Sequence, residues 1–181
     1  MSNDQILQDF QEAFPGNIGV KKFITRLHFA EVQIAAAVLP ARITLFKTAP
    51  TAPAKFSLSQ NGKVQNDFIC KSIGVAWFGS SADLKTIQKE MTLVVKLNGA
   101  TVLEETPISS LCSGGGNASD HTTASGVNGV PAFGARMPIS PIGIGTLDDL
   151  EVELISKGTT AIAVTDLLRV DLWGQEAKKV Q

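Results

Sequence analysis

The chain contains no tyrosine, only two cysteines and two histidines, and fewer charged residues than most soluble domains. Cys70 and Cys112 are too sparse for a disulfide framework and lack the paired spacing of a zinc site, so buried free thiols are expected. Charged residues make up 18% of the chain, and the net charge is −1. This balance provides no overall attraction to nucleic acid or anionic lipid, although folding can still gather a local basic patch.

Long apolar segments are also missing. The uncharged run from Val32 to Ala41 is about ten residues long and contains Pro40, which makes it too short to span a bilayer. No apolar stretch typical of a secretory signal follows Met1. We therefore expect a protein that is made in a cytosol without a signal peptide.

The strongest structural signal is the stretch from Met91 to Glu105. Apolar residues alternate with other residues from Met91 to Leu97, which is the period of a strand with one face in a core. Asn98-Gly99 follows, and Asn-Gly supplies the two positive φ angles of a type I′ turn. The sequence therefore predicts a β-hairpin here.

Most other segments also predict strands. They cover residues 20–38, 42–47, 68–78, 150–154, 162–164 and 168–172. In the first of these the apolar phase changes after Ala30, which indicates a bulge or the junction of two strands. Helices are expected only at residues 3–14 and 80–90. Strands joined mainly by turns predict an all-β, antiparallel, eight-stranded jelly roll or β-sandwich with a short N-terminal helical arm and one short inserted helix.

The expected organisation is an amphipathic arm over residues 1–19, one β-sandwich domain over residues 20–174 and a polar tail over residues 175–181. The domain includes a long loop at residues 106–146, rich in glycine and proline. On the arm, Ile6, Phe10 and Phe14 share a helix face, which can dock on its own barrel or on a neighbouring subunit.

The residues that could suggest catalysis or metal binding are better explained as ordinary parts of loops and strands. His121 and Asp120 crowd one polar loop with Ser113, Ser119 and Ser125, whereas a hydrolytic triad converges from separate segments. The segment SGGGN at residues 113–117 lacks the lysine and the following helix of a phosphate-binding loop. His28 is expected on a polar or contact face.

Two further groups of residues are candidate surface sites. Asp148, Asp149, Glu151 and Glu153 offer oxygen ligands for Ca²⁺, but their alternation with apolar residues favours the solvated face of a strand. Residues 77, 78 and 173 are Trp, Phe and Trp, a candidate glycan-stacking platform, but the low aromatic content favours core tryptophans. We therefore predict no catalytic residue, no cofactor and no metal.

The whole layout resembles the small jelly-roll coat proteins of icosahedral viruses, especially those of tailless, membrane-containing bacteriophages. The segments that carry the resemblance are the arm SNDQILQDFQEAF, the run ICKSIGVAWFGSSADLKTIQKEMTLVVKLNG, the loop LCSGGGNASDHTTASGVNGVPAFGARMP and the closing strand LLRVDLWG. The resemblance implies a single barrel that builds or decorates a capsid, found in the virion and made in the host cytoplasm. Because the arm has only one basic pair, Lys21-Lys22, direct contact with nucleic acid is not expected.

Function is therefore expected to lie in contacts with copies of the same chain and with other virion proteins. Aromatic residues, methionine and arginine are enriched at the centres of interfaces. The predicted contact residues are Ile6, Phe10, Phe14, Phe133, Arg136 and Met137. The alternatives are a β-sandwich module that binds a glycan or host surface, and an enzyme on a cupin-like barrel, for which two histidines supply few ligands.

Overall fold

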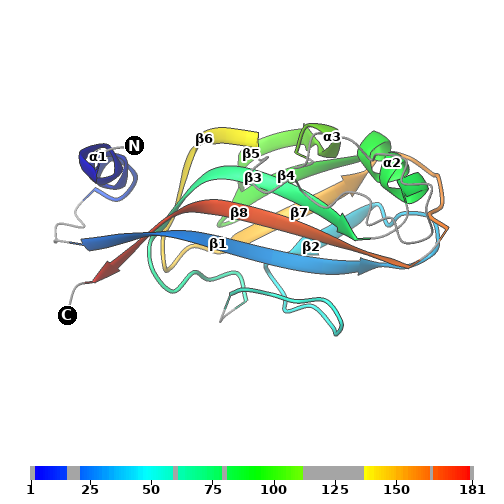
Figure 1. The fold of residues 1–181 in the computed structure, drawn as a ribbon, viewed down its shortest axis with the longest axis horizontal. Helices are drawn as coiled ribbons and strands as arrows, with labels where there is room; N and C mark the ends of the chain where they lie inside the picture. Colours follow the sequence, from blue (N-terminus) through cyan, green and yellow to red (C-terminus); the bar gives the residue numbers. More distant parts are fainter. Residues whose placement is uncertain are drawn as a thin grey trace.

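The chain forms a sandwich of two four-stranded antiparallel sheets, seen in a computed structural model that describes residues 3–15, 21–58, 61–78, 81–111, 137–163 and 165–179 (Figure 1). The first sheet has the order β1 (Lys21–Ile34), β8 (Asp166–Lys179), β3 (Phe68–Phe78), β6 (Met137–Ile144). The second has the order β2 (Arg42–Leu45), β7 (Leu150–Ser156), β4 (Met91–Leu97), β5 (Ala100–Pro107). The helices are α1 (Asn3–Ala13), α2 (Ser81–Glu90) and α3 (Ile108–Leu111). None of the described helices is long and apolar enough to cross a membrane.

The strand pairing is that of one long hairpin rolled into a barrel. Strand β4 pairs with β5, β3 with β6, β2 with β7 and β1 with β8, always antiparallel. The chain changes sheet at every step between successive strands except between β4 and β5. This is the jelly-roll arrangement, and it confirms the predicted fold class.

The core lies between the two sheets and is almost entirely aliphatic and aromatic. Its largest fully buried side chains include Trp77, Phe46 and Phe68. The predicted hairpin is confirmed, because Asn98 and Gly99 have φ angles of 52° and 80° between β4 and β5. The positive φ at both positions is the geometry that a type I′ turn requires.

Strand β1 is continuous, so the bulge or junction predicted after Ala30 is wrong. Its register with β8 runs without a shift from Lys21 to Ile34. The apparent phase change arises because two outward aromatic side chains are covered by other elements. Phe23 packs against α1, and the Arg169 guanidinium lies 5.0 Å from the centre of the Phe29 ring. A register shift occurs instead in β3, between Cys70 and Ser72.

Two strands extend into regions predicted to be irregular. Strand β6 occupies the end of the predicted loop at residues 106–146, where Pro138 and Pro141 disguise its pattern; proline is tolerated there because β6 is an edge strand. Strand β8 continues to Lys179, so residues 175–179 of the predicted polar tail belong to the barrel. They pair with residues 21–25 of β1. Residues 112–136 of the predicted loop lie outside the described residues.

Candidate functional site

Helix α1 is docked on its own barrel, which is the first of the two arrangements left open by the sequence. Phe10 is only 5% exposed and packs on Ile69 and Ala177, which lie on the outer face of the first sheet. Its ring centre lies 4.7 Å from that of Phe23. Outward apolar residues on three adjacent strands thus create the surface that the helix covers.

Polar contacts and close packing fix the position of this helix. Asp9 forms an ion pair with Lys71, with Oδ2 2.5 Å from Nζ. Where the C-terminal end of α1 passes over β6, Gly143 leaves room for Ala13: a Cβ at Gly143 would lie 2.9 Å from the Ala13 Cβ. Phe14 packs on the edge of the same cluster, with its ring centre 5.8 Å from that of Phe10. The arm is therefore a fitted part of the described structure.

A groove runs between β5 and β6, where the edges of the two sheets meet. It has a volume of about 600 Å³. Its lining residues are Leu97, Val102, Leu103, Glu104 and residues 137–143 of β6. Among the described lining residues all but Glu104 and Ser140 are apolar and none is aromatic, so they offer no surface for stacking a sugar ring.

Both edges of this groove resist pairing with a further strand. Pro138 and Pro141 remove backbone donors from β6, and Glu104 places a negative charge on β5, whose other glutamate, Glu105, is paired with Lys157. Proline and charge are the features with which natural edge strands avoid aggregation. A partner at this groove therefore has to be held by side-chain contacts. Of the predicted contact residues Met137 lies here, half-buried, while Phe133 and Arg136 lie outside the described residues.

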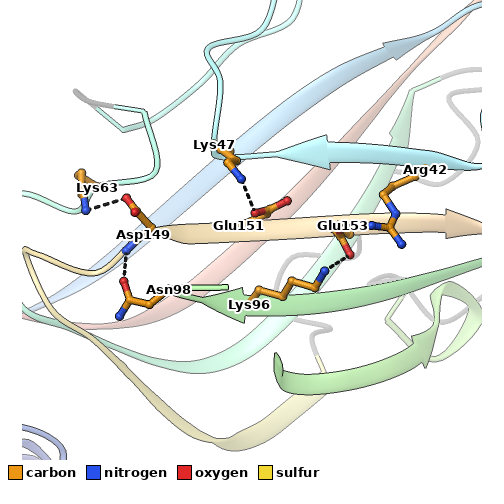
Figure 2. Close-up of polar contacts among 8 residues, drawn as sticks. All are labelled: Arg42, Lys47, Lys63, Lys96, Asn98, Asp149, Glu151 and Glu153. Atoms are coloured by element: carbon orange, nitrogen blue, oxygen red, sulfur yellow. Dashed lines mark hydrogen bonds and ion pairs between the residues drawn. The ribbon is translucent and has the colours of Figure 1, made fainter. Parts of the chain in front are cut away.

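The acidic run on β7, a candidate calcium site in the sequence, is neutralised by lysine and arginine side chains. Glu153 is buried and accepts from Lys96 Nζ at 2.6 Å and from Arg42 Nη1 at 3.0 Å. Glu151 pairs with Lys47, Nζ to Oε2, at 3.0 Å (Figure 2). Arg42 of β2 and Lys96 of β4 reach Glu153 diagonally, because the registers place Thr44 and Val94 directly opposite it, and Lys47 follows the end of β2.

The two aspartates before β7 have structural partners as well. Asp149 lies 2.6 Å from Lys63 Nζ, and its backbone N–H donates to the Asn98 Oδ1 at 2.9 Å (Figure 2). Asp148 accepts from the Asn98 Nδ2 at 2.7 Å and from the Gly145 N–H at 2.7 Å. Within the described ranges, no group of three or more His, Cys, Asp or Glu residues is placed to hold a metal ion. The run is best described as an ion-pair face that joins three strands and two turns.

His28 lies in a buried polar cluster that sequence analysis did not find. Its side chain is inside the barrel and packs edge-on against the Phe68 ring, with the two ring centres 4.7 Å apart. Its Nε2 lies 3.8 Å from Glu176 Oε2, within ion-pair range but too far for a hydrogen bond, and neither ring nitrogen has a hydrogen-bond partner. Glu176 is also buried, and accepts from Asn66 Nδ2 at 2.6 Å and lies 3.5 Å from Arg26 Nε.

A scan of protein-family models, a search of curated proteins and a search of solved structures each found no match to this chain. The contacts above are therefore the observations on which a function can be proposed. They describe surfaces and internal polar clusters. His28 is the one histidine in the described part of the chain, and it faces Phe68 and Glu176 rather than a serine or cysteine nucleophile.

The remaining candidate residues from the sequence are either buried in the fold or lie outside the described residues. Cys70 is a buried free thiol, as predicted, and burial raises its pKa to about 12, which keeps it unreactive. Trp77 is 1% exposed and belongs to the core, so it cannot take part in a stacking platform. Cys112, His121 and the surrounding serine-rich segment lie outside the described residues.

The buried His28 predicts a specific loss of stability in mild acid. Burial lowers its pKa below 6.5, with Arg26 adding to the effect and Glu176 opposing it. The unfolded chain therefore binds a proton at this residue before the folded chain does. Stability from this residue is present above pH 6.5 and falls as the pH decreases from 6.5 toward the lower folded pKa. Urea unfolding of wild type and His28→Phe between pH 7.5 and 5 measures this loss of stability.

We expect the wild type to lose stability relative to His28→Phe as the pH falls. Phenylalanine keeps the contact with Phe68 and has no ring nitrogen to leave unpaired. Carboxylates that titrate in both proteins cancel in the comparison. Parallel stability curves would contradict the prediction.

Proposed function

We propose that this protein is a structural component of a virus particle, capsid or capsid-associated, which acts through contacts with copies of itself and with other virion proteins. The supporting observation is the rolled-hairpin jelly roll, an architecture that coat proteins share with lectins and cupins. The step from architecture to function is one of analogy. Virion location, synthesis in a host cytoplasm and the absence of catalysis belong to the same proposal.

Two further features support a contact role over a cupin-like enzyme. Glu151, Glu153 and Asp149 are matched by lysine and arginine, so this acidic run is used to hold strands together. The groove between β5 and β6 is apolar, and its edges are protected against uncontrolled strand addition. Such a surface suits a defined protein neighbour.

The proposal predicts an assembled state of the purified full chain. Light scattering over a concentration series should give trimers, pentamers or larger particles, and negative-stain microscopy should show rings or shells. Rigid subunits with a large apolar contact surface assemble because burying that surface is favourable. A monomer at every concentration would overturn self-assembly.

The groove also favours a second candidate, a β-sandwich module that binds a host surface or a glycan. In that case the purified protein stays monomeric and the groove remains open to a ligand. The described lining of the groove contains no aromatic side chain, which disfavours a sugar and favours an apolar protein segment. A glycan array and a host-surface binding assay on the monomer would separate the two ligands.

A further inference from the structure

Leu147 is the most exposed large apolar side chain in the described part of the chain. It is 88% exposed, and the next, Val38, is 56% exposed. Leu147 lies in the turn between β6 and β7, where the Asp148 N–H donates to the Gly145 carbonyl at 3.1 Å and the Gly145 N–H donates to Asp148 Oδ2 at 2.7 Å. Turns favour glycine, proline, asparagine, aspartate and serine, so the backbone conformation does not account for a leucine here. We call residues 145–148 the leucine turn.

The leucine turn is held in one position by two neighbouring turns. Asn98 donates from Nδ2 to Asp148 Oδ1 at 2.7 Å and accepts from the Asp149 N–H at 2.9 Å. Lys63 Nζ donates to the Leu147 carbonyl at 2.7 Å and lies 2.6 Å from Asp149 Oδ1 (Figure 2). A contact segment that is already rigid loses little conformational entropy when it binds. The turn is therefore preorganised to present its leucine to another molecule.

A single exposed leucine is ordinary on a protein surface, but this one lies beside the groove between β5 and β6. Leu97 and Gly143 line the groove. Leu97 directly precedes Asn98, which binds the leucine turn, and Gly143 lies four residues before Leu147. Leu147 does not fill the groove of its own chain, because its side chain stays almost fully exposed. One end of the molecule therefore carries an apolar projection and an apolar groove side by side.

We propose that two copies of this chain associate around a two-fold axis, with the leucine turn of each copy in the β5–β6 groove of the other. A two-fold contact uses the same surface on both subunits and must be self-complementary. A projection next to a groove meets this condition, because each copy supplies the part that the other receives. The edges of the groove resist strand pairing, and a leucine side chain is a partner that needs no strand pairing.

Size supports the reciprocal arrangement. An apolar cavity of about 150 Å³ holds a benzene molecule. The groove, at about 600 Å³, therefore has room for Leu147 and for residues beside it. One leucine in one groove buries far less than the roughly 800 Å² per partner of a stable interface. A two-fold axis places two leucine turns and two groove linings in a single interface, and so brings the contact closer to that area.

This inference rests on the proposed function, because it names one of the self-contacts from which an assembly would be built. In a larger particle the same contact would join neighbouring units across two-fold axes. It also names the residues that carry the contact, Leu147 on one side and Val102 on the other, where Val102 lines the groove and is 42% exposed.

The first test measures the native mass of the full chain by sedimentation equilibrium over a concentration series. Leu147→Ser should raise the dissociation constant of the two-fold contact by about 100-fold, since each of two buried leucines is worth about tenfold or more. Val102→Lys places a charge in the groove and should weaken the contact by a similar factor. The matched control, Val38→Ser, removes an exposed apolar side chain between β1 and β2 and should keep the wild-type constant.

The second test identifies the two surfaces by crosslinking. Leu147→Cys protein is mixed with Val102→Cys protein and oxidised, and peptide mass spectrometry should find a disulfide between residues 147 and 102 of different chains. A mixture of Val38→Cys with Val102→Cys is the control and should give no such link between residues 38 and 102. Disulfides through the native Cys70 and Cys112 are common to both mixtures and are distinguished by their peptide masses.

The outcomes separate this contact from the proposed function. A wild type that assembles, with an unchanged dissociation constant in Leu147→Ser or no 147–102 disulfide, would overturn the two-fold contact and leave the proposed function standing. A dimer that depends on Leu147 and forms nothing larger would support the contact and overturn the larger assembly. A wild-type monomer at every concentration would overturn both. Circular dichroism establishes that each variant is folded.

Discussion

Gly174→Ala is expected to destabilise the protein by about 3 kcal/mol, which is a large part of the roughly 5–15 kcal/mol by which a domain is stable. Gly174 is buried in β8 opposite Cys70, where the register of β3 shifts. A Cβ at this position would overlap the Ile69 carbonyl oxygen and lie 2.7 Å from the Ile69 carbonyl carbon. Because the obstructing atoms are backbone, relief requires movement of a whole strand. Urea denaturation followed by tryptophan fluorescence measures the effect.

Gly99→Ala is the matched control for this substitution. Gly99 lies in the exposed hairpin turn, where a Cβ meets nothing within 4 Å, but its φ of 80° is unfavourable for alanine. That conformational cost is about 1 kcal/mol. We therefore predict that Gly174→Ala lowers the free energy of unfolding much more than Gly99→Ala does. Similar losses in the two variants would show that β3 and β8 do not approach as closely as described.

Phe10→Ala is expected to release α1 from the barrel while the sandwich stays folded. Truncation of a buried phenylalanine costs about 3–5 kcal/mol in a core, which exceeds what a short helix can recover from its remaining contacts. The buried part of this satellite cluster is only Phe10, Ile69 and Ala177, separate from the main core. Hydrogen exchange should show loss of protection in α1 and retained protection in β3 and β4.

The same variant tests whether the docked arm matters for assembly. We expect a smaller native mass, because released α1 no longer presents a fixed surface to a neighbouring subunit. Leu7→Ala is the control: it shortens a side chain of the same helix that is 42% exposed, and should change neither protection nor mass. Global unfolding of Phe10→Ala would make α1 an integral part of the core. Release of α1 with an unchanged native mass would show that the arm does not take part in assembly contacts.

Local elements of this fold could be predicted from sequence because their signals lie within a few residues. The hairpin at Asn98-Gly99 and helix α2 depend on turn chemistry and on a short apolar period, and both were predicted correctly. Strand β6 was missed because Pro138 and Pro141 are typical of loops, and only its place at a sheet edge makes them tolerable. The end of β8 was missed because its polar residues pair with β1, distant in sequence.

The candidate surfaces were less predictable, since each depends on residues that meet only after folding. The partners of Glu153 come from β2 and β4, so no spacing rule connects Arg42 and Lys96 to it. His28 and Glu176 sit on strands from opposite ends of the chain. The apolar face of α1 could be predicted from the sequence. The surface on which it docks could not, because that surface depends on Ile69 and Ala177 facing outward from the sheet.

The rolled-hairpin pairing also determines when the protein can fold during its own synthesis. Strand β8 lies between β1 and β3, and β7 lies between β2 and β4, so each sheet has an interior strand from the last third of the chain. Until the ribosome releases these segments, neither sheet can close around its centre. The β4–β5 hairpin can form early, whereas β1 must wait until β8 has been made. The first sheet therefore closes late and slowly, because its final pairing joins segments that are far apart in the sequence.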